Sequence, residues 1–145
     1  VYKRQHLIIS IDFKPPRTKM GLVDSRDGTV LETIIFRSEK NNIEKLLSNI
    51  EHGMEIFNGK SKSFQGLISG IGLVWPTGPD GREANSELWK MLDEEMLKNI
   101  LEKRFSMPCR IEHEEQILAA AETAYGAVGE NAGMQGCAAL FVHIR

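Results

Sequence analysis

Side chains that can take part in acid–base chemistry follow apolar, strand-like runs at two places in the sequence. Asp12 ends the first run, and Glu112, His113 and Glu114 stand at the end of the second. A carboxylate can accept a proton, and an imidazole can both donate and accept hydrogen bonds. Ligands of sheets flanked by helices bind at the carboxyl ends of strands, so these four residues are the first candidates for a site.

The elements that must position these residues are strands and helices in alternation. Short β-branched runs predict strands, and apolar residues at a spacing near the helical repeat predict helices. The predicted strands span 7–12, 19–24, 30–37, 64–74, 107–112 and 138–144, and the predicted helices span 41–59, 86–105 and 114–125. A turn at Ser25–Gly28 joins the second and third strands as a hairpin, and a loop occupies 75–81.

A meander of three strands, followed by strands that alternate with helices, indicates an α/β fold. We expect a mixed sheet of five or six strands with the helices packed against it. Its strand ends supply four segments in which to look for chemistry, namely 12–18, 75–78, 112–116 and whatever follows Ile144.

Composition restricts the class of protein. The chain has 145 residues, of which 41% are hydrophobic and 26% charged, and this is typical of one soluble domain with one core. The formal charge of -2 gives no field that would attract nucleic acid or an anionic membrane, so any DNA contact must come from residues outside this chain. No signal peptide or long apolar span is present, and we expect a cytoplasmic protein.

The cysteines and histidines give no metal-binding or disulfide pattern. Cys109 and Cys137 lie far apart and form no C-x-x-C pair. We expect both to be buried, small apolar groups in a reducing cytosol. The four histidines show no ligand spacing that would build a metal site.

Both ends of the sequence resemble cuts. Residues 1–5 lack an initiator Met and are what the transposon end GTGTATAAGAGACAG would encode, so we interpret them as a sequencing-adapter artefact. At the other end, the apolar run 138–144 stops with no turn or partner after it. We expect a domain over 6–145 whose protein continues into a second lobe.

Four segments share their order and spacing with the motifs of one protein family. Residues 11–24 match D-I-G-G-T-K followed by G-L-V-D, and residues 70–76 match G-I-G-I-G-V-P-G. Asn85 and Trp89 match N-x-x-x-W, and residues 112–126 match E-N-D-A-N-A-A-A-L-A-E-x-x-x-G. On these motifs the chain resembles the amino-terminal lobe of the ROK family of sugar kinases and sugar-responsive transcriptional repressors. The resemblance implies an actin-like, hexokinase-like ATPase lobe of the ribonuclease H-like class.

The resemblance implies that a sugar contacts Gly78, Asn85, Glu112, His113 and Glu114, with Glu114 in the place of the family's catalytic aspartate. Asn85 could equally cap the helix that follows it, and His113 could be a surface histidine beside a helix start. The extra methylene of Glu114 moves the carboxylate by about 1 Å, and such a displacement can lower a rate about 100-fold. We therefore do not expect efficient phosphoryl transfer.

The first phosphate loop departs from the family pattern. The Gly-Gly-Thr that lets backbone amides approach ATP phosphates is replaced by Lys14, Pro15 and Pro16. The two prolines remove two N–H donors and fix two φ angles. Asp12 keeps the acid that the resemblance places near the metal and phosphates, although it could instead cap the strand end.

Other residues near these motifs have two interpretations each. Lys14, Arg17 and Lys19 could attract an anion by charge alone, or be solvated basic residues on a turn. Trp75 could stack on a pyranose ring or, as is more common beside a proline, pack in the core. If the last predicted strand follows the family pattern, Arg145 replaces the first glycine of a second phosphate loop.

The resemblance leaves two functions open. The first is the effector lobe of a ROK-type transcriptional regulator, which senses a sugar without phosphorylating it while an upstream helix-turn-helix binds operator DNA. The second is an ATP-dependent kinase of glucose, mannose or an N-acetylated amino sugar, which needs both lobes, ATP and Mg²⁺. The lost phosphate loop favours the first, and a catalytically inactive scaffold is a third possibility. In either function the family's zinc motif would lie in the second lobe, and the full-length protein would be a homo-oligomer.

Overall fold

The computed structural model describes residues 7–14, 17–37, 43–63, 67–75 and 94–142. The strands are β1 (Leu7–Lys14), β2 (Arg17–Asp24), β3 (Thr29–Arg37), β4 (Ile68–Trp75) and β5 (Cys109–His113). The helices are α1 (Ile43–Ser63), α3 (Glu94–Phe105), α4 (Glu114–Tyr125) and α5 (Ala132–Ala139). Apart from the last element, their order is the predicted one.

The strands form one mixed sheet in the order β3-β2-β1-β4-β5. The meander β1-β2-β3 is antiparallel, and β4 and β5 continue the sheet parallel to β1. The predicted hairpin turn is confirmed, and it ends at Gly28, whose φ of 78° favours a residue without a side chain. The carboxyl ends of the three parallel strands β1, β4 and β5 therefore lie at the same end of the sheet.

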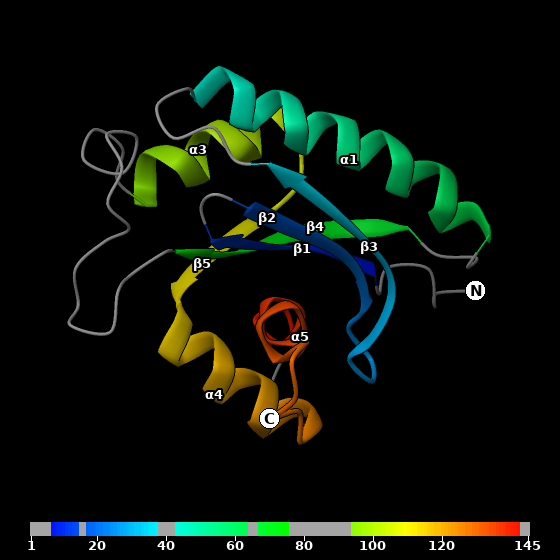
Figure 1. Cartoon of the computed structure of the whole chain (residues 1–145), viewed down its shortest axis with the longest axis vertical. Coiled ribbons are helices and arrows are strands. Elements are labelled where there is room, and N and C mark those ends of the chain that lie inside the picture. Colours follow the sequence, from blue (N-terminus) through cyan, green and yellow to red (C-terminus); the bar gives the residue numbers. More distant parts are fainter. Residues whose placement is uncertain (1–6, 15–16, 38–42, 64–66, 76–93, 143–145) are drawn as a thin grey trace.

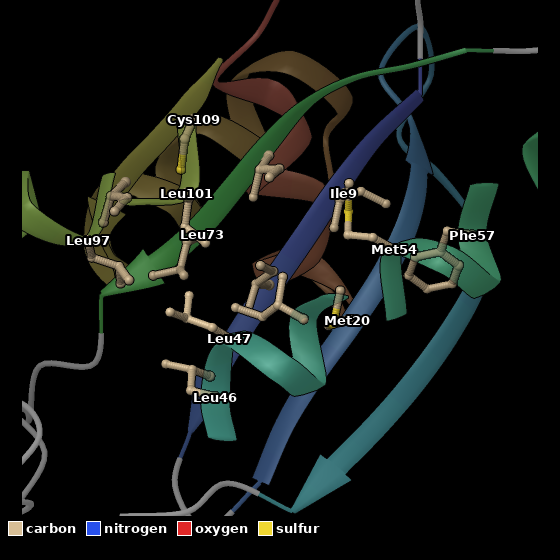
Figure 2. Close-up of a cluster of buried hydrophobic side chains, with 14 of the residues drawn as sticks. Ile9, Met20, Leu46, Leu47, Met54, Phe57, Leu73, Leu97, Leu101 and Cys109 are labelled. Carbon is tan, nitrogen blue, oxygen red and sulfur yellow. The ribbon is translucent and has the colours of Figure 1, made fainter. Parts of the chain in front are cut away.

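Helices cover both faces of the sheet. Helices α1 and α3 lie on one face, and α4 and α5 lie on the other (Figure 1). The main core fills the space between the sheet and α1 with α3, where Ile9, Met20, Phe57 and Leu73 are buried (Figure 2). Strand alternation sends the intervening residues of β1, such as Ile8, to smaller clusters beneath α4 and α5.

The predicted strand over 138–144 is wrong within the described residues. Ala138 and Ala139 end helix α5, and 140–142 form a turn. Helix α5 fits close against the sheet because small residues face it. A Cβ on Gly72 would lie 2.7 Å from the carbonyl oxygen of Cys137, and the hydroxyl of Ser10 donates to the carbonyl of Met134 at 2.7 Å. Arg145 lies outside the described residues.

Burial of both cysteines is confirmed, and it has a consequence at high pH. Burial raises the pKa of Cys109 from 9.0 to about 12 and raises that of Cys137 as well. Burial also raises the pKa of Tyr125 from 10.0 to about 12, and its hydroxyl donates to the carbonyl of Ser25 at 2.7 Å. The folded state therefore holds protons that the unfolded chain releases above about pH 9.

We predict that the free energy of unfolding is fully maintained below about pH 9 and falls as the pH rises towards about 12, because the unfolded state then binds fewer protons. Urea titrations at about pH 8 and about pH 11 would measure the fall. Tyr125→Phe and Cys109→Ala should each make it smaller. Equal unfolding free energies at the two pH values would contradict the prediction.

None of the described helices is long and apolar enough to cross a membrane.

Candidate functional site

The carboxyl ends of β1, β4 and β5 lie at the same end of the sheet, and they bring the predicted acids there. In the strand register, Val74 of β4 pairs with Asp12 of β1 on one side and with Glu112 of β5 on the other. Paired residues of parallel strands share a face, so Asp12 and Glu112 lie on the same face, two strands or about 10 Å apart. Two acids a hundred positions apart in sequence thus lie at the same end of the sheet.

Asp12 lies against the beginning of helix α5. A Cβ on Gly133, in the first turn of that helix, would lie 3.0 Å from Oδ2 of Asp12. Lys19 is the cross-strand neighbour of Asp12, and its Nζ donates to Oδ1 of Asn131, the N-cap residue of α5, at 3.3 Å. A carboxylate beside the first turn is stabilised by the helix dipole. Lys19 is half-buried and bonded, so the interpretation of it as a solvated turn residue is wrong.

The segment from Glu112 to Glu114 joins β5 to α4. His113 has extended backbone angles and occupies the N-cap position, but its side chain makes no capping hydrogen bond. Its Nε2 instead lies 2.6 Å from Oε1 of Glu94, the first residue of α3, and both side chains are about 40% exposed. Glu114 and Glu115 occupy the first turn of α4, where negative charge is favourable.

A cavity of about 230 Å³ opens beside these residues at the β5 edge. Glu94, Glu95 and Glu112 supply carboxylates to its wall, and Lys98 and Arg110 supply cations. Hydrogen-bond acceptors and donors therefore both line a space large enough for a small polar molecule. Sequence reasoning did not find Glu94, because nothing near it in the sequence marks it as a partner of His113.

The connection between β1 and β2 is short. The ladder between the two strands extends to the pair Lys14 and Arg17, so only Pro15 and Pro16 lie between the paired ends. Proline has no backbone N–H. The two residues that connect the strands therefore supply no main-chain donor.

The remaining predicted site residues fall into two groups. Trp75 is 1% exposed and belongs to the main core beneath α1 and α3, so it packs and does not offer a stacking face. Gly78 and Asn85 lie outside the described residues. In the described ranges, no group of three or more His, Cys, Asp or Glu side chains could hold a metal ion.

No protein-family model and no curated protein matches the sequence. Solved structures do match. The inorganic polyphosphate/ATP-glucomannokinase from Arthrobacter sp. strain KM is 20% identical, with a TM-score of 0.63 over 87% of this chain and 51% of that one. A ROK family glucokinase from Streptomyces griseus, solved with glucose and AMPPNP, is 19% identical, with a TM-score of 0.56 over 86% of this chain and 38% of that one.

A ROK family transcriptional regulator, described as a homolog of the E. coli MLC protein, is similar to the same degree. It is 14% identical, with a TM-score of 0.61 over 81% of this chain and 30% of that one. The chain thus spans between 30% and 51% of the length of these three proteins. The predicted α/β fold of the hexokinase-like ROK proteins is confirmed, and kinases and a regulator share it.

Proposed function

We propose that this ROK-type fold is the sugar-sensing effector lobe of a cytoplasmic transcriptional regulator, which binds a sugar without phosphorylating it efficiently. In the full-length protein, an upstream segment would bind operator DNA, and sugar binding would change the population of the DNA-binding state. A ROK family transcriptional regulator is among the solved structures of similar fold, as are kinases, so the fold is compatible with the proposal and does not by itself separate it from the alternative.

The short connection between β1 and β2 is the observation that carries the proposal. Enzymes that transfer phosphoryl groups depend on positioned donors around the phosphates. In the ROK pattern those donors come from the backbone at the positions of Lys14, Pro15 and Pro16, and here the residues between the paired strand ends have none. The residues present therefore do not fit ATP phosphates in the family's manner.

The residues at the carboxyl end of β5 support the proposal of sugar binding. Glu112, His113 and Glu114 follow one another at the end of β5, where Glu112 shares the face of Val74 and His113 contacts Glu94 of α3. Glu112 lines the cavity of about 230 Å³. Carboxylates and an imidazole are suitable partners for sugar hydroxyls, because they accept and donate hydrogen bonds in fixed directions. The glucose in the Streptomyces griseus structure is a ligand of that protein, and it indicates which sugars to test first.

The alternative is an ATP-dependent sugar kinase. Glu114 keeps a carboxylate at the position of the family's base, and kinases are among the structures of similar fold. ATP and Mg²⁺ would be required only in this case, and a zinc site would belong to a second lobe. Main-chain donors supplied by another segment would be needed to replace those lost between β1 and β2.

The test uses the full-length protein with glucose, mannose and N-acetylglucosamine. We expect calorimetry to detect binding of one of these sugars, and a coupled assay to detect no ATP consumption above the sugar-free rate. Glu114→Ala should weaken sugar binding about tenfold, because a hydrogen bond to a charged group is lost. Glu115→Ala is the matched control, since it removes the same charge from the same turn and should leave affinity unchanged.

Two outcomes would refute the proposal. Sugar-dependent ATP consumption would identify a kinase, and Glu114→Ala should then abolish turnover. If none of the three sugars bound, the proposal that this protein senses one of them would be refuted. Reading the gene upstream gives an independent check, because a winged helix-turn-helix there is expected of the regulator and not of the enzyme.

A further inference from the structure

Strand β5 lies at an edge of the sheet, where it pairs with β4 on one side and, within the described residues, with no strand on the other (Figure 1). The carbonyl of Pro108 accepts from the amide of Ile71 of β4 at 2.9 Å. The amide of Cys109, the next residue, instead donates to Oε2 of Glu102 of α3 at 3.0 Å. Backbone groups of alternate residues point to the same side of a strand, so those of Ile111 also point away from β4. Such an edge can accept a further strand.

Two opposite charges stand on one face of this strand. Cys109 and Ile111 belong to the main core beneath α1 and α3. Strand alternation therefore sends Arg110 and Glu112 to the face that carries α4 and α5. Arg110 is exposed, and its guanidinium lies 5.3 Å from the centre of the Phe141 ring, which holds the cation on this face. Among the described residues, no ion pair includes Arg110 or Glu112.

An antiparallel copy of β5, related by a twofold axis at Ile111, matches both the open backbone and the charges. Ile111 then lies opposite Ile111 of the other copy, and two residues placed in this way can exchange both main-chain hydrogen bonds. The flanking positions put Arg110 of each copy opposite Glu112 of the other. These are non-hydrogen-bonded pairs, in which side chains lie closer together, and opposite charges there are stabilising.

The charges also select this register over its neighbours. A twofold axis at Arg110 would put that arginine opposite its own copy, and an axis at Glu112 would put two carboxylates opposite each other. A parallel copy in register would likewise place like charges side by side. Like charges directly opposite in a sheet are destabilising. The arrangement centred on Ile111 is therefore the one in which both charged residues meet an opposite charge.

We infer that the β5 edge pairs with the β5 edge of a second copy of this chain, antiparallel about Ile111. The edge is accessible, because Arg110, Ile111 and Glu112 line the cavity of about 230 Å³ that opens beside it. The two copies would gain two main-chain hydrogen bonds at the axis and two ion pairs beside it. A strand pair of this kind joins the two five-stranded sheets into one continuous sheet.

The inference does not depend on the proposed function, because it concerns assembly and not the ligand. Glu112 is also among the proposed sugar contacts, and the two uses of its carboxylate would compete. The measurements of assembly are therefore made without sugar. A protein that pairs through β5 but binds none of the three sugars would support the inference and refute the proposed function.

The first experiment reverses the charges in the full-length protein and measures the self-association constant by sedimentation equilibrium. Arg110→Glu and Glu112→Arg each replace two attractive pairs by two repulsive ones, and each should lower the constant about tenfold or more. The double variant carries both changes and restores opposite charges at every pair. We expect its constant to return to near the wild-type value, which a loss of folding could not produce.

The second experiment joins the copies covalently. Arg110→Cys protein is mixed with Glu112→Cys protein and oxidised with glutathione disulfide, which takes the two electrons and two protons that the thiols lose. Facing residues of a non-hydrogen-bonded pair have Cα atoms about 4.5 Å apart, which is within reach of a disulfide. The other Arg110 and Glu112 pair stays intact in this mixture. We expect a disulfide-linked dimer from the mixture and little from either protein alone.

Arg104→Glu is the matched control. It makes the same charge change on α3, where Nε of Arg104 lies 3.7 Å from Oε2 of Glu51 of α1, and it should leave the association constant unchanged. An equal loss in the Arg104 and Arg110 variants would reduce the effect to net charge and overturn the inference. A double variant that fails to recover, or equal cross-linking in the mixture and in the separate proteins, would overturn it as well.

Discussion

Gly136→Ala is expected to lower the free energy of unfolding by about 3 kcal/mol, the upper part of the range for an overfilled core. Gly136 lies in α5 where the helix meets α4, and an added Cβ would overlap the carbonyl oxygen of Ile117. That oxygen belongs to the backbone of α4 and cannot rotate away as a side chain would. The two helices must then separate, and urea unfolding of the full-length protein would measure the loss.

Two other glycines provide controls for this substitution. A Cβ on Gly129 would meet nothing within 4 Å, so Gly129→Ala should change the stability by less than about 0.5 kcal/mol. Gly59 lies within α1 and is equally open, and Gly59→Ala should raise the stability by about 0.5 to 1 kcal/mol because alanine favours the helix. If Gly136→Ala behaved like Gly129→Ala, the close packing of α4 and α5 would be refuted.

Trp75→Ala is expected to lower the free energy of unfolding by about 3 to 5 kcal/mol. Trp75 ends β4 and is among the largest fully buried side chains of the described residues. Its removal leaves a cavity that the rigid sheet cannot close. Trp75→Phe should lose less, because the ring of phenylalanine fills part of the same space.

The sugar affinity of Trp75→Phe separates the two interpretations of this residue. Trp75 lies in the core beneath α1 and α3, whereas Asp12 and Glu112 lie on the face of α4 and α5. We therefore expect Trp75→Phe to bind sugar with unchanged affinity at temperatures where it is folded. A selective loss of affinity with little loss of stability would show that the indole contacts the ligand.

Elements with a strong local signal were predicted well from the sequence. Helix α4 begins and ends as predicted, because acidic residues favour its first turn and Gly126 stops it with a left-handed φ of 66°. The amides of Gly126 and Ala127 then close the helix by bonding to carbonyls of its last turns. Helix α1 extends beyond its predicted end at Gly59, because a single exposed glycine costs too little to break it.

Helix α5 could not be predicted in this way. Its sequence contains Gly133 and Gly136, which disfavour helices, and a continuous apolar run follows, which also fits a buried strand. What selects the helix is its fit to the sheet, where Gly21 and Gly72 leave room for Met134 and Cys137. Such a fit depends on residues far away in the sequence, so no local pattern reveals it.

Only part of the candidate site could be predicted, and the reason is similar. Strand ends are visible in the sequence, so Asp12 and Glu112 could be expected at one edge of the sheet, and the register with Val74 places them there. The partner of His113 is Glu94, from the start of another helix, and the partner of Arg17 is Arg37. These pairings depend on helix packing and strand register, which composition and spacing do not specify.

The contacts of α5 also have a consequence for synthesis. Ser10 bonds to Met134, the carbonyl of Gly28 accepts from Gln135, and the carbonyl of Ser25 accepts from Tyr125, so the first strands are joined to residues at least a hundred positions later. On a ribosome, the face of β1 and β2 that α5 covers stays uncovered until nearly the whole of this segment has emerged. A nascent chain that pauses before Ala132 would present that face to chaperones, or to other unfinished copies of itself.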